Sequence, residues 1–87
     1  MNGHAMDDTA ALMSFLRAEL RAIKPALPAE LPAEAHYRYV LNLDSLDLVE
    51  LVARIEQRCG VMIPDADLPE FVSLDATVRY VLARVPA

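Results

Sequence analysis

The 87-residue sequence has few of the features that mark secreted or membrane-spanning proteins. Its single cysteine, Cys59, cannot form an internal disulfide, which excludes a small disulfide-stapled scaffold. No run of about 18 apolar residues occurs, so no transmembrane helix is predicted. Residues 1–8 lack the basic region and apolar stretch of a secretory signal. We therefore expect a cytoplasmic protein, with residues 1–7 as a flexible tail.

Basic residues are also scarce, because 8 Lys and Arg oppose 13 Asp and Glu, a formal net charge of −5. An acidic chain repels nucleic-acid phosphates and anionic lipid, so we expect neither nucleic acid nor membrane as a partner. The hydrophobic fraction of 55% is too high for a disordered acidic tail and predicts a packed core. A chain this short buries only about 60–65% of its unfolded surface, which argues against a deep catalytic cleft.

Only two glycines are present, and no segment alternates like a strand over more than four residues. Apolar residues at helical spacing instead predict three main helices, over residues 8–24, 45–59 and 74–84. Residues 65–71 have room for one or two further turns. We predict an all-α, small four-helix bundle over residues 8–85, with three main helices and one short helix, as a monomer. The residues expected in its core are Phe15, Leu16, Leu20, Leu51, Ile55, Ile63, Phe71, Val78 and Val81.

A long connection over residues 25–43 separates the first two predicted helices. Three prolines between residues 25 and 32 prevent a continuous helix. The second half of the connection contains Tyr37, Tyr39 and Leu41, which is too apolar for a free linker. We expect this half to be pinned to the core, with the tyrosines as anchors. Connections of this length are more often functional than simple links.

Acidic residues concentrate in one stretch, residues 44–75, which has a net charge of −6 and leaves +1 elsewhere. Such a run is most often a solvated face. At its start, Asp44 is expected to cap the second main helix, which places Ser45 at the first helical position. The free backbone N–H groups and the positive dipole there favour an attached phosphate. A serine at a helix start is nevertheless commonest as a plain capping residue.

The residues that follow Ser45 help to decide between phosphate attachment and plain capping. Ser45 continues into an amphipathic segment over residues 46–56, and Ile63-Pro64-Asp65 follows it. This combination resembles the acyl carrier protein family, whose signature is Asp-Ser-Leu at the start of the second helix. An Ile-Pro-Asp turn before a short third helix is also typical of the family, as is a tyrosine followed by an aliphatic residue in the last helix, here Tyr80-Val81. The resemblance runs without a gap over residues 41–82.

The resemblance implies a non-catalytic carrier. Ser45 would hold a covalent 4′-phosphopantetheine arm, whose thiol carries acyl intermediates as thioesters in polyketide, fatty acid or related specialised biosynthesis. Asp44 would form part of the surface that a phosphopantetheinyl transferase reads. The other partners would be acyl-loading enzymes, ketosynthases or acyltransferases with basic docking patches. The residues expected to contact these partners are Leu46, Asp47, Val49, Glu50, Arg54 and Glu56.

The sequence departs from the family at three places. Asn42 stands where the family has glycine, although asparagine also tolerates a left-handed conformation. Arg38-Tyr39-Val40 replaces an acidic run. Arg54 and Arg58 interrupt the acid-rich second helix, either as ordinary helix-stabilising charges or as an adaptation to particular partners.

Two alternatives remain open at this point. A peptidyl or aminoacyl carrier is the nearer one, but the two glycines that such domains usually carry before the serine are missing. The other is a helical protein–protein adaptor in which Ser45 only caps a helix and is never modified.

No catalytic or metal-binding set is predicted. The sequence has no Gly-x-Ser-x-Gly motif and no histidine placed as a base for Ser45. His4 and His36 lack metal-ligand spacing. Asp65 and Asp67 are expected to cap the short helix rather than to bind a metal.

Overall fold

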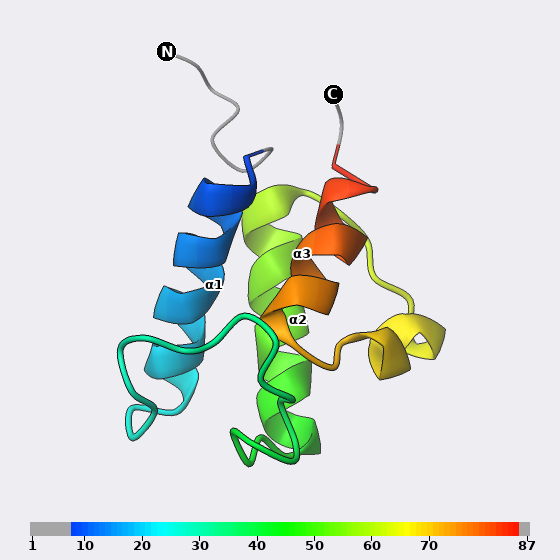
Figure 1. Cartoon of the computed structure of the whole chain (residues 1–87). Coiled ribbons are helices and arrows are strands. Elements are labelled where there is room, and N and C mark those ends of the chain that lie inside the picture. The colour runs from blue at the N-terminus through cyan, green and yellow to red at the C-terminus, as the bar shows by residue number, and fades with distance from the viewer. Residues whose placement is uncertain (1–7, 86–87) are drawn as a thin grey trace.

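The computed structural model describes residues 8–85, so the predicted tail over residues 1–7 lies outside it. The described chain forms α1 (Thr9–Ile23), α2 (Ser45–Cys59), the 3-10 helix η2 (Asp65–Glu70) and α3 (Leu74–Leu82), with no strand among these residues. Helix α1 packs against both α2 and α3, and it runs antiparallel to them, while η2 lies to one side (Figure 1). The predicted all-α bundle of three main helices and one short helix is confirmed.

Local signals in the sequence set most helix ends. The carboxylate of Asp8 accepts a hydrogen bond from the Ala10 N–H at the start of α1 (3.3 Å). The hydroxyl of Ser73 accepts from the Ala76 N–H at the start of α3 (3.2 Å). Helix α3 ends at Leu82, two residues before the predicted end at residue 84. The reason is a tighter last turn, in which the Arg84 N–H bonds to the Val81 carbonyl at 2.9 Å.

The core contains all of the predicted residues except Phe15. This ring is only partly buried, because it faces a groove between α1 and α2 beside Arg58, whose guanidinium carbon lies 5.7 Å from the ring centroid. The leucines of α1 that are fully buried are Leu12, Leu16 and Leu20.

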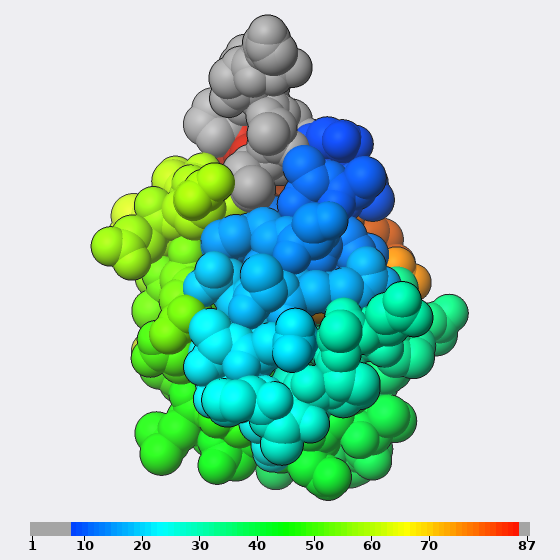
Figure 2. Space-filling view, turned by 90° about the vertical axis from the view of Figure 1, so that its left-hand side faces the viewer, coloured from blue at the N-terminus to red at the C-terminus, as the bar shows by residue number. Residues whose placement is uncertain are grey.

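The connection between α1 and α2 contributes more to the core than its sequence suggested. It is pinned along most of its length rather than in its second half alone, because Leu27 and Leu31 are also buried. The guanidinium of Arg17 donates two hydrogen bonds to the Leu31 carbonyl, at 3.0 and 2.8 Å. Figure 2 shows the first part of this connection, in cyan and teal, lying against the end of α1.

Tyr37 fixes the second half of the connection. Its side chain is fully buried, and its hydroxyl lies 2.7 Å from the hydroxyl oxygen of Thr77 on α3. The Thr77 hydroxyl already donates to the Ser73 carbonyl (2.8 Å), so Tyr37 is the donor of the shared bond. The Tyr37 N–H also bonds to the Val72 carbonyl (2.7 Å). Tyr37 therefore ties the loop that precedes α2 to α3 and to the residue pair before it.

The three tyrosines differ from one another. Tyr37 is buried, as expected of an anchor, and Tyr80 on α3 is buried as well. Tyr39 is 83% exposed, so its predicted role as an anchor is wrong. Its ring instead stacks on His36, with 4.3 Å between the ring centroids, because the turn that buries Tyr37 leaves Tyr39 on the outside.

Candidate functional site

The start of α2 is held by a reciprocal capping box. The Asp44 carboxylate accepts from the Asp47 N–H (2.8 Å), and the Asp47 carboxylate accepts from the Asp44 N–H (3.1 Å). Ser45 follows the cap as the first residue of the helix, and it is exposed. Because Asp44 supplies the cap, the start of α2 does not depend on the Ser45 hydroxyl.

The backbone that leads into Ser45 is held from two sides. Asn42 adopts the left-handed conformation (φ 59°), so the predicted tolerance of this residue for that conformation is confirmed. The ammonium group of Lys24, at the end of α1, donates to the Asn42 carbonyl at 2.7 Å. The Leu43 N–H bonds to the Tyr37 carbonyl at 2.9 Å. These contacts fix the position from which α2 begins.

Ser45 lies on the wall of an open groove of about 350 Å³, between the start of α2, the preceding loop and η2. Most of the lining is apolar, and the polar side chains come from the loop and from Ser45 itself. The residues that line the groove are His36, Arg38, Ser45, Leu48, Val49, Leu68, Pro69, Phe71 and Val72. An exposed hydroxyl beside an apolar groove suits a covalently attached group that has both polar and apolar parts.

Comparison with known proteins agrees with this geometry. A family model described as the phosphopantetheine attachment site matches residues 14–81. A mitochondrial acyl carrier protein of Neurospora crassa is 40% identical over 60 residues, which cover 69% of this chain and 45% of that protein. An acyl carrier protein of Rubrobacter xylanophilus is 39% identical over 54 residues, covering 62% of this chain and 67% of that protein. One from Helicobacter pylori is 38% identical over 53 residues, covering 61% and 68%.

The chain belongs to the acyl carrier protein family.

Members of this family are non-catalytic carriers, and their cofactor is covalently attached 4′-phosphopantetheine. The residues present fit this group, because an exposed hydroxyl stands beside a groove with basic and apolar lining. When bound, the group supplies a thiol for thioester formation. The chain spans less than half of the Neurospora protein and about two thirds of the two bacterial carriers.

The residues predicted to contact partners fall into two groups. Leu46 and Val49 are large apolar side chains that are 78% and 52% exposed, and Glu50 is also exposed. All three are exposed beside Ser45, and the Glu50 side chain remains exposed although its carboxylate accepts a bond from Arg54. Asp47 is half-buried and serves the capping box, so its carboxylate is already engaged within the carrier.

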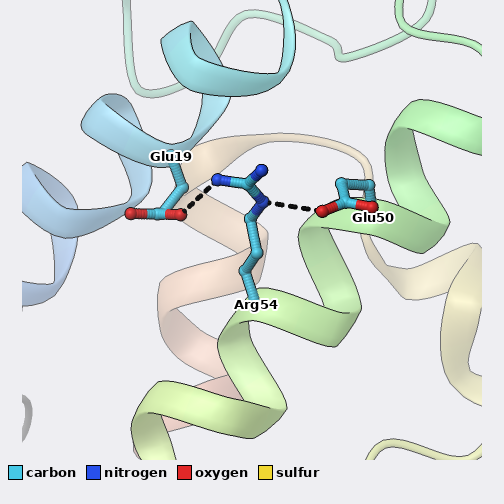
Figure 3. A network of polar contacts seen from close by, with 3 residues as sticks. All are labelled: Glu19, Glu50 and Arg54. Carbon is cyan, nitrogen blue, oxygen red and sulfur yellow. Dashed lines mark hydrogen bonds and ion pairs between the residues drawn. The ribbon is translucent and has the colours of Figure 1, made fainter.

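Arg54 has an internal partner that the sequence did not reveal. One nitrogen of its guanidinium donates to Glu50 on the same helix at 2.9 Å, and another donates to Glu19 on α1 at 2.8 Å (Figure 3). These two bonds raise the pKa of Arg54, and the bond to Glu19 has the larger effect. Of the two interpretations of Arg54, the contacts favour stabilisation of the carrier itself. Glu19 was missed because only the packing of α1 on α2 brings it close.

Glu56 is also engaged inside the carrier. Its side chain is half-buried, and its carboxylate accepts a hydrogen bond from the Ile63 N–H at 2.9 Å. The contact ties the segment between α2 and η2 to the last turn of α2. Its place on the surface that partners would touch remains a prediction.

The predicted capping role of Asp65 and Asp67 is wrong. Helix η2 follows Pro64, and no side chain caps it. Asp67 instead accepts from the Tyr80 hydroxyl at 2.5 Å and lies 4.0 Å from the Arg84 guanidinium. The carboxylate is drawn to α3 because η2 packs against that helix. Burial, together with the bond to Asp67, raises the pKa of Tyr80.

Two further properties concern residues 8–85. They contain no cluster of three or more His, Cys, Asp or Glu side chains that would suit a metal ion. None of their helices has the length and apolarity needed to cross a bilayer.

Cys59 is half-buried at the end of α2, and burial raises the pKa of its thiol, an effect that Arg58 partly opposes. Its thiolate is therefore less available than that of a free cysteine.

Proposed function

We propose that Ser45 carries the 4′-phosphopantetheine arm and that the chain carries acyl intermediates on it as thioesters. The observation that carries this proposal is the position of Ser45, which is exposed, first in α2 and relieved of capping by Asp44. We place the carrier in polyketide, fatty acid or related specialised biosynthesis.

The loading step is a transfer of the phosphopantetheinyl group from coenzyme A by a phosphopantetheinyl transferase. The Ser45 oxygen attacks the phosphorus that bears the pantetheine, a phosphodiester forms, and 3′,5′-adenosine bisphosphate leaves as the serine loses its proton. This chain acts as substrate in that step. Asp44 contributes by fixing where Ser45 stands, through the bond that its carboxylate accepts from Asp47.

We propose that the partner surface is the exposed side of α2 next to Ser45. Leu46 and Val49 would supply apolar contacts, while Asp47 and Glu50 would attract basic patches and speed association. Arg54 and Glu56 would act at the edge of this surface while keeping their bonds to Glu19 and Ile63. The partners would be the transferase and acyl-loading, ketosynthase or acyltransferase enzymes.

We also propose a monomer in the cytoplasm. The relatives include both mitochondrial and bacterial carriers. Microscopy of the tagged chain in its own cells tests the compartment, and a signal confined to an organelle would contradict it.

Incubation with coenzyme A and a broad-specificity transferase, followed by intact mass measurement, tests the proposal. We expect the protein to gain the mass of one phosphopantetheinyl group. The S45A variant should gain nothing, while S14A, which removes an exposed serine from α1, should load like the wild type. No gain in the wild type, as an unmodified adaptor predicts, would contradict the carrier function. A gain that survives in S45A would contradict the attachment site.

A further inference from the structure

Arg38 places a basic side chain at the groove beside Ser45. It belongs to the loop that precedes α2, it is exposed, and it lines the same groove as Ser45. Among the residues that line this groove, His36 is the only other one with a basic side chain. Within residues 8–85, the arginines that form ion pairs are Arg54 and Arg84, so Arg38 is not engaged in one there.

The backbone that carries Arg38 is held firmly. The Nδ1 atom of His36 accepts hydrogen bonds from the N–H groups of Arg38 (3.1 Å) and Tyr39 (3.3 Å). The His36 carbonyl accepts from the N–H of Val40 (2.9 Å). Tyr37, next to Arg38, is fully buried and bonded to Thr77. The guanidinium is therefore presented from a fixed turn rather than from a free loop.

The groups around Ser45 are negatively charged. Asp44 precedes Ser45 and Asp47 follows it two residues later, and the capping box keeps both carboxylates at the start of the helix. A phosphodiester on Ser45 would add another negative charge to this end of the helix. An arginine can offset that charge and donate two parallel N–H bonds to phosphate oxygens, a geometry that lysine cannot supply.

We infer that Arg38 pairs with the phosphodiester of the arm and thereby holds the start of the arm over the groove. The inference rests on the proposed attachment to Ser45. Arg38 acts as a positioning residue, because it touches the arm and not the reacting thioester. The apolar groove lining, including Leu68, Phe71 and Val72, would then lie beneath the part of the arm beyond the phosphate. The site is exposed, so the pair is weak. Loss of Arg38 should lower the equilibrium constant for holding the arm over the groove by about two- to fivefold.

Nuclear magnetic resonance of the loaded protein tests this inference. The apo and holo forms are prepared with ¹⁵N label, and intact mass first establishes that each variant carries the arm. In the wild type, the Nε–H signal of Arg38 should shift on loading, and high salt should reverse the shift. The ³¹P relaxation of the phosphodiester should report a restrained phosphate. In R38Q the phosphate should become more mobile, and R38K should restore only part of the restraint.

The matched control is R79Q, which removes an equal charge from an exposed arginine on α3 that lines a different hollow. Its ³¹P relaxation should equal that of the wild type. If the Arg38 signal does not move on loading and the ³¹P relaxation is the same in all variants, the inference is wrong. If the wild type fails to load at all, the proposed function fails instead, so the two failures are distinguishable.

Discussion

Single side chains decide where α2 begins and what lies beside it. Asp44 and Asp47 close the capping box, and this leaves the Ser45 hydroxyl outside the helix-stabilising contacts. Tyr37 acts from a greater distance, since its bond to Thr77 joins the loop to α3. The two effects are complementary: the cap positions Ser45 along α2, and Tyr37 positions the loop that forms one side of the groove.

Tyr37→Phe tests this residue's role. The variant keeps the packing but loses the hydroxyl that donates to Thr77, and we expect the free energy of unfolding to fall by about 1 kcal/mol near neutral pH. Denaturant titration measures the change. Tyr39→Phe is the matched control, because Tyr39 is exposed and its loss of a hydroxyl should leave stability unchanged.

The burial of Tyr37 also predicts that the free energy of unfolding depends on pH. Burial raises the pKa of Tyr37 in the folded protein well above its usual value of about 10, whereas the unfolded chain keeps that usual value. Above about pH 10 the unfolded state therefore releases a proton that the folded state retains, and stability falls as pH rises. The stability advantage of wild type over Y37F should shrink above about pH 10. An advantage that is constant with pH would contradict the buried environment of Tyr37.

At the scale of elements, α2 is fixed by signals that lie within a few residues of its ends. Its bounds were predicted correctly at both ends, because Asp44 caps the start and Gly60, with φ 71°, ends the helix in the left-handed conformation. Contacts between elements were not predictable in this way. The bonds of Arg54 to Glu19 and of Asp67 to Tyr80 depend on which helix faces which, and no local pattern encodes that.

Glu56 offers a test of how α2 is joined to η2. Glu56→Ala removes the acceptor for the Ile63 N–H and should cost about 1–2 kcal/mol of stability. Glu56→Gln keeps an acceptor oxygen and removes the charge, so its unfolding midpoint should stay closer to that of the wild type. Thermal unfolding of the two variants gives the comparison. Equal destabilisation would mean that the charge, and not the hydrogen bond, braces this segment.

E56Q also separates structure from recognition. If the charge of Glu56 contributes to docking, this variant should load more slowly with the transferase although it remains folded. Unchanged loading kinetics would remove Glu56 from the proposed partner surface.

At the scale of the whole molecule, the net charge of −5 conceals an uneven distribution, with −6 over residues 44–75. These residues include all of α2, where Leu46 and Val49 are exposed beside acidic side chains. Three basic residues have contacts inside the molecule: Arg17 and Lys24 bond to loop carbonyls, and Arg54 joins two helices. Glu50 stays exposed next to Leu46 and Val49, on the face of α2 that we propose for docking.

Glu50→Lys should therefore weaken docking. We expect the apparent KM of the transferase for the apo carrier to rise by about three- to tenfold, and its dependence on salt to become shallower. Glu30→Lys is the control, since Glu30 is an exposed acid in the loop after α1 and the charge change is identical. Circular dichroism should show the same helix content in both variants. Equal effects of the two substitutions would indicate that net charge alone, and not this surface, governs docking.

The most direct test of the carrier account is to locate the arm in the chain. After loading with coenzyme A, proteolysis and fragmentation mass spectrometry should find the phosphopantetheinyl group on Ser45, with Ser14 and Ser73 unmodified. A group found on another residue, or an unmodified Ser45 in a preparation in which the transferase loads a known carrier, would contradict the account.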